Sequence, residues 1–350
     1  MNFIEKLVSI AAVACAVSVS SGAAGAQGVE FEKNILTGGP TGTYIQIGRD
    51  IAGLAGKCGM TLNVLESGGG MENFLAVRKT PHTQFGIVQN DVLEYLRTYA
   101  ADDPAIARAI FGVRIAFPLY NEELHILAKK EIASIEDLAG RRVAIGDPDS
   151  GTFLTSSLVL DLSGIEPAER LGQSADASLA QLLAGEIDAF FYVAGVPTKI
   201  FMNDAIDAER FHLLPITSPT LRAAYVETSI PAGTYSFQPE AVEVIAVKAV
   251  LMTYEYNRNK NAYNRASCDA VSDISNLIFT RFGQLRESGH PKWKNVDLND
   301  IPPGWDVSAC VNRGLAEDYQ PECAPKVPPP AAGSEANRVY RARICATFGC

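Results

Sequence analysis

The chain has 350 residues, of which 30 are basic and 40 are acidic, so its formal net charge is −10 at pH 7. An acidic chain without a basic stripe is a poor partner for nucleic acid, whose phosphates attract clusters of Lys and Arg. The length allows two domains with separate hydrophobic cores.

The first 26 residues have the pattern of a cleavable export signal. Lys6 lies near the start, residues 7–19 are apolar, and Ala24-Gly25-Ala26 offers a small-x-small cleavage site. A buried first helix and a membrane anchor are the alternatives, but the apolar run is too short to cross a bilayer. Cys15 lies in a poor match to a lipobox. The sequence therefore predicts a soluble protein exported to the periplasm or another extracytoplasmic compartment.

The first element of the mature chain is a strand, a glycine turn and a helix. A short apolar run ends at Gly38-Gly39, and an apolar pattern of helical period begins at Tyr44. Such a turn can hold a small anion, because glycine lets the backbone come close and the helix start is partly positive. The glycine spacing is neither that of a P-loop nor that of a dinucleotide-binding fingerprint.

Two further strands end in polar or glycine turns that begin helices. Residues 62–66 precede Ser67-Gly68-Gly69-Gly70, and residues 84–89 precede Asn90-Asp91. In open α/β sheets these turns lie at the carboxyl edge of the sheet, where ligands bind.

A second set of alternating strands and helices follows. Ser134 begins a capping-box-like turn, and the turn at residues 146–152 begins a helix. Strands are predicted at residues 124–128, 142–145, 188–194 and 211–216. The alternation favours an α/β fold with largely parallel sheets.

The last third begins with a long predicted strand at residues 242–252 and an apolar helical stripe from Ile274 to Leu285. Regular periodicity fades beyond Gly289, where prolines are frequent. Six cysteines remain after signal cleavage: Cys58, Cys268, Cys310, Cys323, Cys345 and Cys350. Their spacing fits neither a zinc knuckle nor a redox motif and indicates disulfides, for which six cysteines allow about 15 pairings. Proximity favours Cys310–Cys323 and Cys345–Cys350, and leaves Cys58–Cys268 by elimination.

Taken in series, six segments resemble the TAXI family, the solute-binding proteins of one branch of TRAP transporters. Their order and spacing match across roughly residues 33–285. They are residues 37–44 (TGGPTGTY), 66–73 (ESGGGMEN), 86–91 (GIVQND), 147–152 (DPDSGT), 188–197 (DAFFYVAGVP) and 230–235 (IPAGTY).

The resemblance implies a two-lobed, type II periplasmic-binding-protein-like α/β fold. Each lobe has a central, mostly parallel sheet flanked by helices, and the ligand cleft lies between the lobes. Lobe I would comprise residues 27–122 and 224–290, and lobe II residues 123–223, with two crossover strands as the hinge. Residues 291–350 would form a C-terminal tail that contains proline and cysteine.

The implied function is capture of a small organic anion or amino acid, such as glutamate or 2-oxoglutarate, for delivery to an integral-membrane TRAP permease. No catalytic residue, metal or cofactor is expected. The motif positions imply these ligand-binding residues: Thr41, Gly42, Thr43, Tyr44, Ser67, Gly68, Gly69, Gln89, Asp91, Ser150, Gly151, Thr152, Gly195, Val196, Pro197 and Tyr235.

Several of these positions have a structural alternative. Asp91 fits a helix start better than a ligand contact, and Tyr44 fits a core tyrosine equally well. Residues 195–197 fit a plain strand-to-helix turn. Ser150-Gly151-Thr152 is the strongest candidate, because a helix start with hydroxyls can bind a carboxylate. The motifs contain no arginine that could clamp a carboxylate in bidentate fashion, so a neutral polar ligand is an alternative.

Two other function classes stay open from the sequence. The first is an enzyme on the same scaffold, either similar to thiamine-precursor synthases or a hydrolase with Ser150 as nucleophile. The four histidines show no recognisable pairing with that serine. The second is a sensor or interaction protein derived from a binding protein, with the cysteine-containing tail as its docking element.

Overall fold

The computed structural model describes residues 31–323 and 335–348, so the predicted export signal lies outside the described residues. Its strands are β1 (Asn34–Leu36), β2 (Asn63–Leu65), β3 (Thr83–Gln89), β4 (Val113–Lys129), β5 (Arg142–Ala144), β6 (Glu169–Leu171), β7 (Ala189–Ala194), β8 (Phe211–Leu213), β9 (Val226–Ile230) and β10 (Val242–Tyr254).

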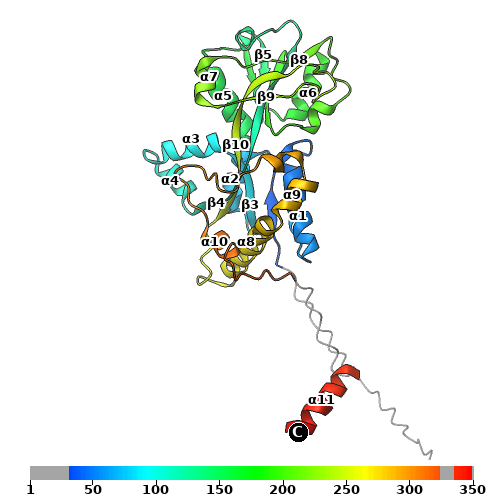
Figure 1. Cartoon of the computed structure of the whole chain (residues 1–350). Helices are drawn as coiled ribbons and strands as arrows, with labels where there is room; N and C mark the ends of the chain where they lie inside the picture. Colours follow the sequence, from blue (N-terminus) through cyan, green and yellow to red (C-terminus); the bar gives the residue numbers. More distant parts are fainter. Residues whose placement is uncertain (1–30, 324–334, 349–350) are drawn as a thin grey trace, which may run out of the picture. The chain divides into compact units, whose positions relative to one another are not determined.

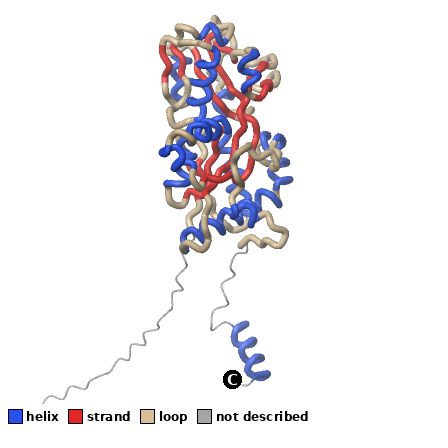
Figure 2. Tube along the Cα trace, turned by 90° about the vertical axis from the view of Figure 1, so that its left-hand side faces the viewer, coloured by secondary structure: helices blue, strands red, loops and turns tan. Residues whose placement is uncertain are grey.

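Helices cover this sheet on both sides (Figure 2). The α-helices are α1 (Thr43–Lys57), α2 (Gly70–Lys79), α3 (Asn90–Ala100), α4 (Pro104–Ile110), α5 (Gly151–Ser163), α6 (Ala175–Ala184), α7 (Pro219–Ala224), α8 (Ala262–Thr280), α9 (Phe282–Ser288), α10 (Ala309–Gly314) and α11 (Glu335–Phe348). Short 3₁₀ turns are η1 (Ile135–Leu138), η2 (Lys199–Met202) and η3 (Pro291–Asn295). None of the helices in the described ranges is long and apolar enough to span a bilayer.

The sheet contains two similar halves joined through its middle strands. Its order is β2-β1-β3-β10-β4-β7-β5-β6, with β8 beside β4 and β9 beside β10. In one half β1, β2 and β3 are parallel and β10 is antiparallel to them. In the other half β5, β6 and β7 are parallel and β4 is antiparallel to them. The α/β, two-lobed fold class predicted from the sequence is confirmed.

The long strands β4 and β10 run antiparallel through both lobes (Figure 1). At one end β10 pairs with β3, and at the other β4 pairs with β7 and β8. The sequence predicted only residues 124–128 of β4. Pro118 and the polar residues 121–123 interrupt the apolar pattern, but Pro118 lies opposite Val250 where the register of the pair shifts, so the strand continues through it.

Each lobe has a hydrophobic cluster on both faces of its sheet. In the first lobe, α1 and α8 pack on one face through Ile47 and Ile274, and α2 and α3 pack on the other through Phe74 and Val92. In the second lobe, α5 and α7 cover one face, and α6 and η2 cover the other. The predicted capping box at Ser134 is confirmed at the start of η1.

The chain beyond residue 290 packs against the first lobe as far as Cys323. Trp293 and Val311 are fully buried in the same cluster as α1 and α8. These contacts could not be predicted from the sequence, because η3 and α10 are too short to show helical periodicity. The lobe boundaries expected from the resemblance stay a prediction.

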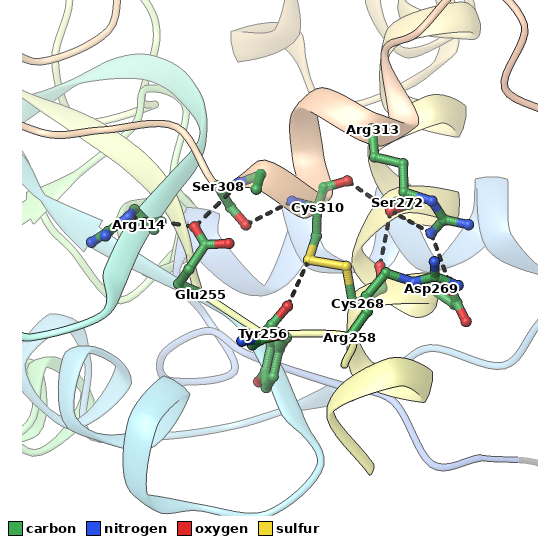
Figure 3. Close-up of a disulfide and its surroundings, with 12 residues drawn as sticks. Arg114, Glu255, Tyr256, Arg258, Cys268, Asp269, Ser272, Ser308, Cys310 and Arg313 are labelled. Carbon is green, nitrogen blue, oxygen red and sulfur yellow. Dashed lines mark hydrogen bonds and ion pairs between the residues drawn. A yellow bond between two sulfur atoms is a disulfide. The ribbon is translucent and has the colours of Figure 1, made fainter. Parts of the chain in front are cut away.

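Two disulfides join cysteines of residues 31–323: Cys58–Cys323 and Cys268–Cys310. The predicted pairs Cys310–Cys323 and Cys58–Cys268 are therefore wrong. α10 packs on α8, so Cys310 faces Cys268 (Figure 3), while Cys323 reaches the end of α1. Sequence proximity misled because the short helix directs Cys310 into the core. Cys345 is disulfide-bonded, and its predicted partner Cys350 lies outside the described residues.

Around the Cys268–Cys310 bond, hydrogen bonds tie the end of the chain to α8. The Ser272 hydroxyl donates to the Cys310 carbonyl oxygen at 2.7 Å, and Arg313 Nη1 donates to Asp269 Oδ1 at 2.6 Å (Figure 3). This segment is thus held covalently and by buried polar contacts.

We expect the double substitution Cys268→Ala/Cys310→Ala to lower the free energy of unfolding by about 2–5 kcal/mol, the usual effect of removing a native disulfide. Denaturant unfolding measures this decrease, and the oxidised wild-type protein is the reference. Non-reducing peptide mapping should recover Cys58 linked to Cys323 and Cys268 linked to Cys310. A peptide that joins Cys310 to Cys323 would contradict the pairing.

Candidate ligand-binding site

A partly open cavity of about 60 Å³ lies where the two lobes meet. Three helices begin at it, with Gly42, Gly69 and Ser150 as their N-caps. The lining residues are Gly38, Gly39, Gly42, Thr43, Tyr44, Gly68, Gly69, Gly70, Gln89, Glu122, Ser150, Gly151, Thr152, Tyr192, Val193 and Ala194. The cavity has room for only a few water molecules, so the two lobes are closed around it.

The free backbone N–H groups at the three helix starts differ in their hydrogen-bond partners. In α2, the N–H groups of Met71 and Glu72 donate to the carbonyl oxygen of Asp149 in the other lobe, at 3.0 and 3.1 Å. In α5, Ser150 Oγ accepts from the N–H of Phe153. The N-cap of α1, Gly42, provides no side-chain cap. The first turn of α1 is therefore the helix start that is left for a ligand.

Hydrogen bonds across the interface hold the closed form. Thr43 Oγ1 donates to the Gly195 carbonyl oxygen at 2.6 Å, and Thr198 Oγ1 donates to the Thr41 carbonyl oxygen at 3.2 Å. Thr41 Oγ1 also lies 3.2 Å from both carboxylate oxygens of Asp176. These residues come from α1, its preceding turn and the facing lobe, so separation of the lobes would break all of them.

Close approach across the cavity depends on glycine. A Cβ atom at position 151 would overlap the carboxamide oxygen of Gln89, and a Cβ at position 42 would lie 2.8 Å from the Tyr192 hydroxyl. Any side chain at either position would therefore fill the cavity or displace its wall.

A carboxyl group forms part of the buried wall. Tyr44 donates its hydroxyl hydrogen to Glu122 Oε2 at 2.6 Å, and Glu122 is 1% exposed. Burial raises the pKa of Glu122 well above its ordinary value, and the negative charge of Glu123 adds to this, against the hydrogen bond from Tyr44. Burial also raises the pKa of Tyr44, so its hydroxyl stays protonated and continues to donate.

The neighbouring Glu123 forms a salt bridge with a lysine side chain. Lys292 Nζ lies 2.5 Å from Glu123 Oε1 and donates to the Asn121 carbonyl oxygen at 2.8 Å. The N–H of Val196 donates to Glu123 Oε2 at 3.0 Å. Both members of this pair are buried, so it is a paired and hydrogen-bonded charge of the kind that interiors tolerate.

A second cavity of about 90 Å³ adjoins the first and shares Gly39, Gly68, Ser150, Thr152 and Tyr192 with it. Its other lining residues are Thr41, Ser67, Gly146, Asp147, Ser174, Ala175, Asp176 and Phe191. Together the two chambers form a small polar cleft with acidic side chains.

The predicted site residues fall into three groups. The first cavity is lined by Gly42, Thr43, Tyr44, Gly68, Gly69, Gln89, Ser150, Gly151 and Thr152. The second cavity adds Thr41 and Ser67. Asp91 lies instead in the first turn of α3, beside a groove of about 660 Å³, where Thr155 of the other lobe donates to its Oδ2 at 2.5 Å.

Besides Asp91, four predicted residues lie outside the lining of both cavities: Gly195, Val196, Pro197 and Tyr235. Gly195 and Val196 use backbone groups to contact Thr43 and Glu123, so they support the wall. Tyr235 is 1% exposed, and its hydroxyl accepts from the N–H of Thr198 and lies 2.9 Å from His125 Nε2. It is a hydrogen-bonded core residue.

Sequence reasoning missed Glu122 and Tyr192 as lining residues. The signal for Glu122 was a charged residue inside an apolar strand run, which is rare unless the residue is paired or functional. Tyr192 lies in the run at residues 188–194, whose alternation was hidden because both faces of β7 are largely covered.

Ser150 is engaged as a helix cap. Its Oγ donates to the carbonyl oxygen of Asp147 at 2.6 Å and accepts from Phe153. Its hydrogen bonds within the described residues do not include a histidine. The geometry is that of an N-cap and gives this hydroxyl no general base.

We predict that Gly151→Ala lowers ligand affinity at least about tenfold, or about 1.4 kcal/mol, because the new methyl group displaces the Gln89 carboxamide from the cavity wall. Calorimetry or fluorescence titration measures the affinity. The matched control is Gly53→Ala in α1, whose Cβ would meet nothing within 4 Å. Equal affinity of the two variants would refute the predicted effect.

A second prediction concerns Asp91. Burial raises the pKa of this carboxyl to about 6, with hydrogen bonds from Thr155 and the Val92 N–H acting against it. A raised pKa favours the folded state below about pH 4, and this contribution is lost as the pH rises through 6. Relative to Asp91→Asn, the wild-type free energy of unfolding should fall by at most about 3 kcal/mol between pH 4 and 7. Urea titrations across that range test this, and parallel curves for the two proteins would contradict it.

Several solved structures are similar to this chain at low sequence identity. A Bordetella bronchiseptica RB50 protein has 14% identity and a TM-score of 0.46, over 83% of this chain and 91% of that one. MatC from Rhodopseudomonas palustris with bound malate has 17% identity, coverages of 73% and 88%, and a TM-score of 0.44. The GluR0 ligand-binding core from Nostoc punctiforme in complex with L-glutamate has 13% identity, coverages of 71% and 98%, and a TM-score of 0.38.

The family comparison covers most of the chain. The model of the NMT1-like family matches residues 35–281, which include the cavity-lining residues of both lobes. The chain belongs to the NMT1-like family.

Proposed function

We propose that this protein is an extracytoplasmic solute-binding receptor of the TAXI type, which captures a small polar solute between its lobes and delivers it to a TRAP permease in the membrane. The observation that supports the proposal is the small cavity, whose walls come from both lobes at the starts of three helices. A ligand there contacts both lobes, so it stabilises the closed form by differential binding.

The proposed hinge is the crossing of β4 and β10. Lobe I then comprises residues 27–122 and 224–290, lobe II comprises residues 123–223, and residues 291–323 pack on lobe I. Rotation about two adjacent strands would open the cavity by breaking the contacts of Thr41 and Thr43 with the facing lobe, while the strand pairing stays intact.

The other function classes have weaker support. A serine hydrolase would need a base beside Ser150, whose hydroxyl is instead a helix cap. Residues 291–323 are poor candidates for a docking element, because two disulfides attach them to the first lobe. The export signal and the extracytoplasmic location belong to the proposal through the pattern of residues 1–26, and transfer to a permease belongs to it through the TAXI resemblance.

The test is a thermal-shift and unfolding screen of small organic acids, amino acids and amines. A solute at 100 times its dissociation constant should add about 2.7 kcal/mol of stability, and small-angle scattering should show closure. The solute should be recovered unchanged by mass spectrometry. The Gly151→Ala variant, with its narrowed cavity, should show a smaller shift. If no solute stabilises the protein, or if the solute is converted, the receptor proposal fails.

A further inference from the structure

The ionisable side chains of the cleft are acidic or phenolic. The first cavity is lined by Glu122, and the second by Asp147 and Asp176. Neither set of described lining residues includes Lys, Arg or His. An anionic ligand would therefore meet like charges, relieved only by the helix starts.

Glu122 is the deepest of these groups and has no cation of its own in the described chain. Among the described residues, the Tyr44 hydroxyl donates a hydrogen bond to its side chain. The nearest basic group, Lys292, is bound to Glu123 and to the Asn121 carbonyl oxygen. A buried carboxylate without a cation is costly, and burial accordingly raises the pKa of Glu122. A positively charged group in the cavity would remove that cost.

A second acceptor lines the same cavity. Gln89 Oε1 accepts no hydrogen bond from the described residues, although Gln89 is only 3% exposed. Gln89 ends β3, opposite Ala249 of β10, and Glu122 lies opposite Val247 of the same strand. The pairing with β10 thus places on one wall an amide oxygen that lacks a donor and a carboxyl group whose hydrogen bond comes from Tyr44. A buried acceptor without a donor favours an N–H ligand.

We infer that the bound solute presents a protonated amine to Glu122 and Gln89, and that it carries no more than one carboxylate. This inference rests on the proposed receptor function and narrows its solutes to those that are not dicarboxylates. The single carboxylate, where present, fits the first turn of α1, because Gly42 leaves that helix start without a side-chain cap.

The test is a binding series on one carbon skeleton, measured by calorimetry with the full-length mature protein. The five-carbon probes are glutarate, 2-oxoglutarate, L-glutamate, 5-aminovalerate, L-ornithine and 1,5-diaminopentane. A three-carbon series of malonate, pyruvate, L-alanine and 1,3-diaminopropane separates charge from size. We expect the best amine with at most one carboxylate to bind at least about tenfold more tightly than any dicarboxylate of its series.

Two variants assign the amine contact. Glu122→Gln keeps the shape of the wall but removes its charge, and should reduce the affinity for the preferred amine at least about tenfold. Gln89→Leu removes an acceptor that has no partner among the described residues, so folding should be unaffected while amine affinity falls. The matched control is Glu166→Gln, an exposed carboxylate that lines neither cavity, which should bind like wild type.

Each outcome decides the inference. If a dicarboxylate binds most tightly, or if both Glu122→Gln and Gln89→Leu keep wild-type amine affinity, the inference is overturned while the receptor function stands. If Glu122→Gln does not fold, the outcome for Gln89→Leu decides. If no member of either series binds but a solute without an amine stabilises the protein in the broader screen, the inference is overturned and the receptor function stands. If no solute of that screen stabilises the protein either, the receptor function fails.

Discussion

The pairing of β4 with β10 is the constraint on which the rest of the structure depends. Both strands are long enough to belong to two lobes, and their antiparallel register runs from Val113 opposite Tyr254 to Glu123 opposite Ala246. Beyond that point the strands separate to different neighbours, β4 to β7 and β8, and β10 to β9. Backbone hydrogen bonds thus cross between the lobes, and the cleft lies where the strands change partners.

The same strand pairing positions the polar side chains of the cleft. β10 lies between β3 and β4, so Gln89 at the end of β3 and Glu122 on β4 are held two residues apart along β10. Strand register is a rigid way to fix two side chains, because a slip by one residue would turn each to the opposite face. The helix starts around them come from turns that can approach closely only at glycine, as at Gly42 and Gly151.

Much of this architecture could be predicted from the sequence, because short strands followed by glycine or serine turns leave a local signal. The starts of α1, α2 and α5 were located that way, and their residues line the cavity. Contacts between distant segments left no such signal. Pro118 concealed half of β4, and the pairing of Cys58 with Cys323 depends on where residues 291–323 fold back. Glu122 was missed because its environment is set by β10 and not by its neighbours in sequence.

Residues 291–323 contribute one charged side chain, Lys292, next to the cleft. Lys292 reaches Glu123 from η3, which is held against the first lobe by buried Trp293 and by the disulfide-stapled chain that follows. Two adjacent buried carboxyl groups on β4 would repel each other if both were ionised without a cation. Because Lys292 pairs with Glu123, the cost of ionising Glu122 is reduced, yet Glu122 itself is left without a counter-ion in the described chain. If the solute carries an amine, as proposed, Glu122 is therefore the carboxyl group of the two that meets its charge, and the fold of residues 291–323 contributes to the selectivity of the cleft.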